Sequence, residues 1–193
     1  HLIKVEADVS DGLPSFTMVG LPSTQVKEAQ DRVRTALKNN GIALPPKRIT
    51  VNLAPADIRK EGAGFDLPLA AAVLAAAGVL SAEQLGNVMM AGEIGLNGEI
   101  HAVSGILPMI IRAREEKCRF CVVPYDNLKE AHLIPDMKVI GVADLQEMIR
   151  YVSAPDSYKK AVETGKKSPQ ENSVDFCEIH GQESLKRAVE IAV

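Results

Sequence analysis

The sequence has no tryptophan, few other aromatic residues and only three cysteines among its 193 residues. Aromatic side chains make up 4% of the chain, so its core has to be built from Val, Ile, Leu and Ala. Three cysteines cannot form the disulfide framework of a small secreted domain, and such usage suits a reducing compartment. We therefore expect a cytoplasmic protein that is stabilised by aliphatic packing.

Long hydrophobic runs and an excess of one charge are also missing. The longest apolar run, residues 67–80, has a proline in its first turn, and it is shorter than the roughly 20 residues that a membrane span needs. We expect a buried helix there and no membrane partner. The net charge of −3 implies no global attraction to nucleic acid. The chain starts with His1 and shows no leader, so we expect it to begin within a longer protein, already in a strand.

The residues that commonly bind metals do not form a recognisable ligand set. Cys118 and Cys121 have the spacing of a zinc half-site, but we expect them in a strand, where an odd offset points the two thiols to opposite faces. There is no second cysteine pair, and the four histidines lie far apart. We expect no metal site.

Hydrophobic periodicity and turn signals predict alternating strands and helices. Strands are expected at residues 2–9 and 15–19, paired as a hairpin, and at 48–53, 88–93, 99–103, 120–123 and 139–142. Helices are expected at 23–40, 67–77, 104–116, 128–132 and 144–152, with Ser23, Asp66, Ser104 and Asp144 as N-caps. Hairpins followed by β-α-β units predict an α+β fold, a mixed sheet with packed helices, over residues 1–153. Residues 154–173 have the composition of a linker, and residues 174–193 predict a turn that enters an amphipathic helix.

Two glycine-bearing segments resemble the proteolytic domain of Lon-type proteases. They are Arg-Lys-Glu-Gly-Ala-Gly-Phe-Asp at residues 59–66, and Gly-Glu-Ile-Gly-Leu-Asn-Gly-Glu-Ile at residues 92–100, which leads to Leu107. The resemblance implies the Lon proteolytic-domain fold, shared with the second domain of ribosomal protein S-five, and a Ser–Lys catalytic pair. Gly64 and Leu107 stand where the serine and the lysine are expected. A serine needs an amine to accept its proton, so we expect no peptidase activity and no catalytic residue.

Other sites remain possible near these segments. Ser104 and Lys60 could in principle replace the missing pair, although Ser104 suits a helix cap and Lys60 a solvated loop tip. Gly62 and Gly64 could present backbone N–H groups to a phosphate. However, Glu61 and Asp66 crowd negative charge there, and no Gly-Lys-Ser/Thr follows.

A group of basic residues offers a possible nucleic-acid contact. Its members are Lys38, Lys47, Arg48, Arg59 and Lys60, in loops that we expect on one side of the same strand. Such residues could meet DNA phosphates. The alternative is ordinary solvated charge, because no aromatic stacking platform lies nearby.

The resemblance becomes more specific over the whole chain. The segments at residues 5–14, 19–22, 27–34 and 49–62 (among them Val-Gly-Leu-Pro and Ile-Thr-Val-Asn-Leu-Ala-Pro-Ala-Asp-Ile-Arg-Lys-Glu-Gly) are similar to those of the ComM/YifB family, often labelled magnesium-chelatase-like. Members carry a Lon-like domain ahead of an AAA+ ATPase module. The resemblance implies a hexameric motor that uses ATP and Mg²⁺, associated with DNA branch migration during transformation.

The same resemblance assigns roles at the C-terminal end. Residues 174–193 are similar to the start of the AAA+ module, with Ile179 and Gly181 on the adenine side of the nucleotide. The phosphate-binding loop would lie beyond Val193, so this chain alone should not hydrolyse ATP. We expect an accessory domain for oligomer assembly and DNA or partner engagement. A motor subunit for metal insertion is the alternative, and a surviving Lon-type peptidase is disfavoured.

Overall fold

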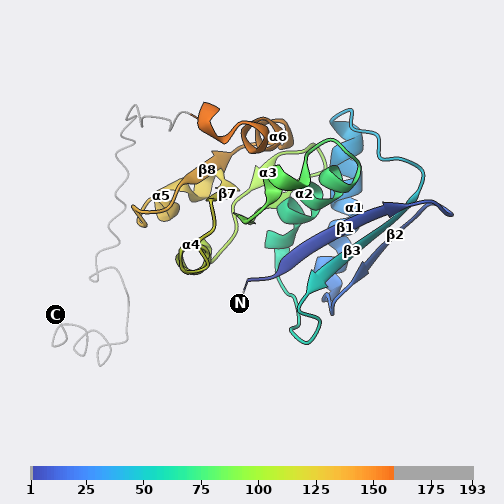
Figure 1. Cartoon of the computed structure of the whole chain (residues 1–193), viewed down its shortest axis with the longest axis horizontal. Coiled ribbons are helices and arrows are strands. Elements are labelled where there is room, and N and C mark those ends of the chain that lie inside the picture. The colour runs from blue at the N-terminus through green and yellow to red at the C-terminus, as the bar shows by residue number, and fades with distance from the viewer. Residues whose placement is uncertain (1, 159–193) are drawn as a thin grey trace, which may run out of the picture. The chain divides into compact units, whose positions relative to one another are not determined.

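The computed structural model describes residues 2–158, which belong to one compact unit. Its elements alternate between short strands and helices (Figure 1). The strands are β1 (Lys4–Ser10), β2 (Ser15–Val19), β3 (Arg48–Ala54), β4 (Val88–Met90), β5 (Glu93–Ile94), β6 (Ile100–His101), β7 (Phe120–Pro124) and β8 (Val139–Val142). The α-helices are α1 (Thr24–Asn39), α2 (Asp66–Ala76), α3 (Ala82–Leu85), α4 (Ile106–Glu115), α5 (Leu128–Ala131) and α6 (Leu145–Ser153), and 3₁₀ turns cover η1 (Ala63–Phe65), η2 (Tyr125–Asn127) and η3 (Pro155–Ser157). The expected α+β class, with sheets and packed helices, is confirmed.

The first sheet has the order β1-β3-β2. β3 pairs antiparallel with β1 and parallel with β2, so the chain crosses over through α1 before β3 enters between the two earlier strands. Alternate residues of β3 (Ile49, Val51 and Leu53) are buried, because one face of the sheet packs on the core. The predicted hairpin of residues 2–9 with 15–19 is therefore wrong, because both strands pair with β3.

Helix α1 forms as its sequence predicts. The Ser23 hydroxyl accepts a hydrogen bond from the Val26 N–H, which satisfies one of the free donors of the first turn. The apolar stripe of Val26, Ala29, Val33, Ala36 and Leu37 is buried and packs in the core cluster that also holds β3 and α2. Gly41, with φ +76°, follows the helix in a conformation that suits glycine.

Helix α2 lies between the two sheets (Figure 1). Leu67, Leu69, Val73 and Leu74 are buried on one side, while an alanine-rich side faces a cavity. Asp66 is not the N-cap. It is the first helical residue and makes no side-chain cap bond to the helix, because its carboxylate is bound by Arg32 of α1 and by the Ile94 N–H.

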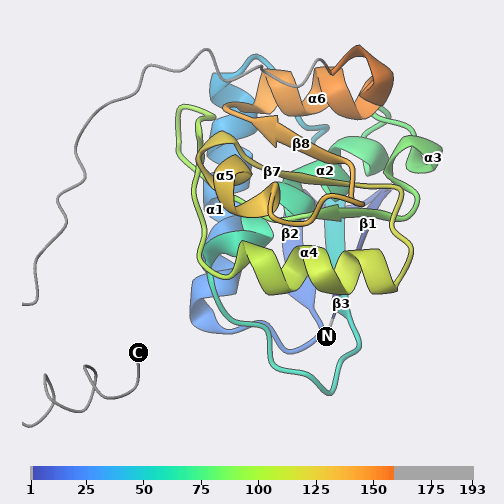
Figure 2. The same cartoon turned by 90° about the vertical axis from the view of Figure 1, so that its left-hand side faces the viewer.

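The second sheet has the order β4-β7-β8, and all of its pairs are parallel. Helices cover both of its faces: Figure 2 shows α4 on one side of β7 and β8 and α6 on the other. Along β7, Phe120 and Val122 pack in the first core cluster, whereas Cys121 and Val123 pack in the second, with α4. Burial on both faces explains why this strand lacks polar alternation.

The segments that join and follow the sheets extend the fold. The Asn97-Gly98 turn joins β5 and β6, as predicted, but the predicted strand at residues 88–93 is divided, because residues 88–90 form β4 and pair parallel with β7. The Asp144 carboxylate caps α6 by accepting from the Glu147 N–H. Residues 154–158, assigned to the linker from composition, pack on this unit: the Tyr158 hydroxyl accepts from the Gly141 N–H, and its ring meets that of Tyr151 edge-on. Residues 159–193 lie outside the described part of the chain, and with them most of the predicted linker and the start of the AAA+ module.

Candidate functional site

A cavity of about 1180 Å³ lies between the two sheets. Its lining comes from residues 2–7 around β1, residues 61–65, the alanine-rich side of α2, residues 86–91 around β4, and the chain that leads into α4. Gly64, one of the two positions that correspond to a Lon-type catalytic pair, is among the lining residues. This cavity is therefore the candidate functional site.

The loop that carries Gly64 is held in place by its neighbours. The Gly64 carbonyl accepts from the Gly92 N–H, and the Gly92 carbonyl accepts from the Leu67 N–H. A Cβ at Gly64 would make ordinary contacts with Ala91 and Val103, each 4.0 Å away. The position thus has room for a side chain and holds none.

Leu107 does not lie in this cavity. Its backbone N–H donates to the Glu130 carboxylate, and it is not among the lining residues. The α4 residue that lines the cavity is Met109, two positions further on. Helical residues two positions apart are rotated by about 200° around the helix axis, so Leu107 and Met109 lie on nearly opposite sides of α4. The structure does not bring Gly64 and Leu107 together, and sequence reasoning missed Met109, which the helical period could have revealed.

Neither Met109 nor Ser104 completes a catalytic pair. A thioether cannot take a proton from a hydroxyl. Ser104 lines the cavity, but among the described residues its hydroxyl has no lysine partner. Ser104 is also not the N-cap of α4, since Gly105, with φ +78°, occupies that position.

An ion pair with a buried carboxylate joins α1 to the start of α2, directly after η1. Arg32 donates to both carboxylate oxygens of Asp66, at 2.7 and 2.9 Å, and Asp66 is fully buried. The same carboxylate accepts from the Ile94 N–H at 3.1 Å. The hydrogen bond to Asp66 raises the pKa of the Arg32 guanidinium. The bonds that Asp66 accepts tie α1, α2 and β5 together.

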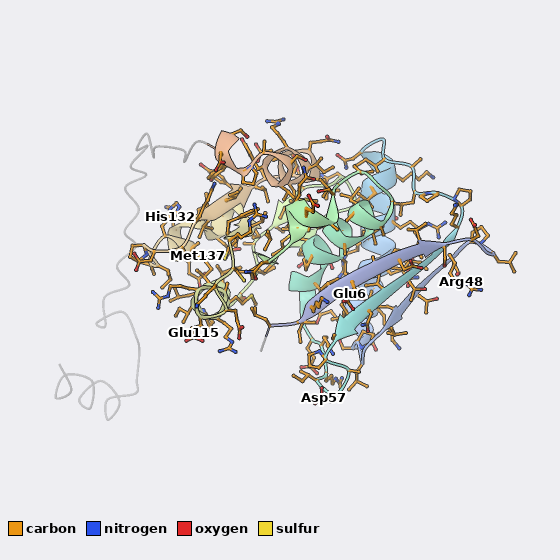
Figure 3. All side chains as sticks on the ribbon, viewed as in Figure 1. Glu6, Arg48, Asp57, Glu115, His132 and Met137 are labelled. Atoms are coloured by element: carbon orange, nitrogen blue, oxygen red, sulfur yellow. The ribbon has the colours of Figure 1, made fainter. Side chains whose placement is uncertain are left out.

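The basic residues do not form one patch. Lys47 and Arg48 lie at the start of β3, whereas Arg59 and Lys60 lie in the loop that follows its end. Asp57 belongs to that loop, and Figure 3 shows Arg48 and Asp57 at opposite ends of the sheet. A seven-residue strand is roughly 20 Å long. Lys47 pairs with Asp11 and Arg59 with Glu61, each at 2.9 Å, and Lys38 lies in the last turn of α1.

Lys60 is buried, and the expectation of a solvated loop tip is wrong. Its side chain is 1% exposed, and its ammonium donates to the Pro55 carbonyl. The Lys60 backbone bonds to Leu21 and Ser23 at the start of α1. These bonds hold the loop at residues 55–60 against the rest of the fold, and the buried ammonium is not accessible to a phosphate.

The cysteines are set apart by burial. Cys121 is fully buried in β7, and burial raises the pKa of its thiol to about 12. Cys118 lies before β7 rather than in it and is half-buried. Within residues 2–158, no group of three or more His, Cys, Asp or Glu side chains could hold a metal ion.

The described residues also do not fit a nucleotide phosphate. Gly62 precedes a 3₁₀ turn of three residues and Gly64 is its middle residue, Glu61 is exposed beside it, and Asp66 is already bound to Arg32. Ile179 and Gly181, the expected adenine contacts, lie outside the described residues. None of the helices between residues 2 and 158 has the length and apolarity needed to cross a bilayer.

The fold and the cavity define a Lon-like α+β domain, and comparisons with known proteins agree. A family model described as subunit ChlI of Mg-chelatase matches residues 5–127. Competence protein ComM of Haemophilus influenzae is 40% identical over 195 residues, covering 99% of this chain and 38% of that protein. YifB of Escherichia coli is 40% identical over 189 residues, covering 98% of this chain and 37% of its own length.

Similarity to a peptidase is weaker. Lon protease 2 of Bacillus subtilis is 27% identical over 128 residues, covering 65% of this chain and 22% of that protein. The chain belongs to the magnesium-chelatase-like (ChlI) family that includes ComM and YifB. It spans less than two fifths of the length of these ComM and YifB relatives.

Proposed function

We propose that this chain is the non-catalytic, Lon-like accessory domain of a ComM/YifB-type AAA+ ATPase. In this proposal it supports assembly of a hexamer and engages DNA or a partner protein during branch migration in transformation. ATP and Mg²⁺ are used by the full-length protein, with Ile179 and Gly181 on the adenine side of the nucleotide and the phosphate loop beyond Val193.

The observation that carries the proposal is the cavity without a catalytic pair. Gly64 has room for a side chain but holds no nucleophile, and Met109 brings no titratable group. The loop around Gly64 is nevertheless held by ordered backbone bonds. A peptidase scaffold that keeps its shape without its chemistry is suited to binding and assembly.

In this proposal, the exposed basic residues make the contacts with DNA. Lys47, Arg48 and Arg59 are candidates for contacts with phosphates, whereas the buried ammonium of Lys60 is not. Since the candidates lie at two ends of β3, each end is treated as a separate contact. Each lost phosphate contact should lower the salt dependence of binding by about one unit of the log–log slope.

A second candidate function is a motor subunit for metal insertion. The match to a family model described as subunit ChlI of Mg-chelatase favours it. The residues of this chain are compatible with both functions, because the distinguishing chemistry would lie in the motor and its partners.

The deciding experiment uses the full-length protein with and without residues 1–158. We expect DNA to stimulate its ATPase activity, and we expect loss of these residues to weaken hexamer assembly and branch migration. Stimulation only by a porphyrin and partner subunits would instead favour metal insertion. Within the full-length protein, the Lys47→Ala/Arg48→Ala variant should weaken DNA binding most at low salt, whereas Lys138→Ala, on the β8 side of the fold, is the matched control.

A further inference from the structure

Two strand edges face the same cavity. β1 is the edge of the first sheet and β4 the edge of the second. Residues 2–7 and residues 86–91 both line the cavity between the sheets. An edge strand presents a row of backbone N–H and C=O groups that can pair with another strand.

Within the described part of the chain, the outer side of each of these two edge strands has no strand partner. β1 pairs with β3, and β4 pairs with β7, each on one side only. No other backbone bond joins β1 or β4 to a further segment of residues 2–158. Within residues 2–158, each sheet therefore ends at this cavity in an edge strand whose outer side has no strand partner.

The floor of the cavity is shaped for an apolar strand. Pro68, Ala71, Ala72, Ala75 and Ala76 line it from α2 and fill little space. Ile3, Val5, Val88 and Met90 flank it and are only half-buried, although they pack against the core. An added strand with large aliphatic residues at alternate positions would bury these side chains.

We propose that one extended segment of the full-length polypeptide, joined to the N-terminal end of β1, fills this cavity as an added strand between β1 and β4. The relatives are more than twice as long as this chain, so the full-length polypeptide has further segments to supply it. A segment that enters through β1 needs a connection of only two to five residues, since antiparallel strands are joined by short hairpins. Leu2 already packs in the second core cluster, while Ile3 and Val5 pack in the first, so the chain entering β1 runs beside the cavity.

Amide hydrogen exchange tests the added strand by comparing this chain with the full-length protein. In the full-length protein the amides of β1 and β4 should exchange at least tenfold more slowly than in residues 1–193. The amides of β3 and β7, which are paired on both sides, serve as internal controls and should change little. Equal exchange at β1 and β4 in the two proteins would overturn the proposal, and so would protection that depends on protein concentration, because a second copy would then supply the strand.

A substitution in the α2 lining of the cavity distinguishes protection by an added strand from a general stabilisation of the fold. Ala72→Leu should remove the protection of β1 and β4 in the full-length protein, because the larger side chain occupies the place of the strand. In residues 1–193 the same change should leave exchange at these strands unchanged, since the cavity has room. Arg34→Leu, an exposed position of α1, is the matched control and should affect neither protein. Protection that survives Ala72→Leu in the full-length protein would contradict the proposal.

Discussion

Arg32 of α1 and Asp66 of α2 form a bidentate ion pair, with a shortest N–O distance of 2.7 Å. The Asp66 carboxylate is fully buried, and it also accepts from the Ile94 N–H. One carboxylate therefore satisfies donors from two other elements. Its loss would leave a guanidinium and a backbone N–H without their acceptor.

Asp66→Asn should destabilise the fold by about 3–5 kcal/mol, the usual loss when one partner of a buried pair is removed. Urea unfolding of residues 1–193, followed by circular dichroism, measures this loss. The control is Glu28→Gln: Glu28 lies 3.9 Å from Arg32 and is mostly exposed, so its change should cost less than about 1 kcal/mol. Similar losses for the two variants would show that the pair with Asp66 is not a major source of stability.

Lys60→Ala should lower the free energy of unfolding by about 2–5 kcal/mol, the range for truncating a long buried side chain. The neighbouring Arg59→Ala removes an exposed pair with Glu61 and should change stability by less than about 1 kcal/mol. DNA binding should respond in the opposite order, with Arg59→Ala the more damaging variant. A stable Lys60→Ala protein with weakened DNA binding would mean that the ammonium is accessible after all.

The buried Cys121 thiol predicts a pH dependence of stability. Its pKa is raised by burial from its ordinary value of 9.0 to about 12, so between these values the folded state keeps a proton that the unfolded state loses. The contribution is complete below about pH 8.5 and falls as pH rises, by at most about 1.4 kcal/mol per pH unit. Urea unfolding between pH 8 and pH 10 should show a steeper fall for the wild-type chain than for Cys121→Ala. Cys118→Ala is the control and should keep most of that slope, because Cys118 is only half-buried.

Gly64→Ser should fold normally and remain inert. A Cβ at Gly64 meets only Ala91 and Val103, at 4.0 Å, so the change in stability should stay within about 1 kcal/mol. Lys4, which lines the cavity, has its ammonium paired with Glu6, so we expect no amine to activate the new hydroxyl. Neither this variant nor the wild-type chain should be labelled by a fluorophosphonate probe. Gly92→Ala is the steric control, since a Cβ there would come within 3.1–3.3 Å of Ile100 and Leu67. Labelling of the wild-type chain that is lost in Ser104→Ala would show a surviving nucleophile.

Local signals in the sequence predicted local structure well. Ser23 and Asp144 cap their helices, the α1 stripe is buried, and Asn97-Gly98 turns between β5 and β6. Each of these depends on residues only a few positions apart. The α+β class followed from the same signals and is confirmed.

Features set by distant partners could not be predicted in this way. The pairing of β1 and β2 with β3 depends on a crossover through α1, and the role of Asp66 depends on Arg32 and Ile94. The burial of Lys60 depends on the return of its loop onto the start of α1. Met109 differs, because its place among the residues that line the cavity follows from the period of α4, which a motif match along the chain does not take into account.

The central position of β3 also determines when the N-terminal half can fold. Within residues 2–158, the strand that pairs with both β1 and β2, residues 48–54, is synthesised after them, so β2 would leave a ribosome with both edges unpaired. A chain cut before residue 54 should therefore stay unfolded or aggregate, and completion of the first core also needs residues of β7, β8 and α6. Assembly of this half is delayed by its own chain order.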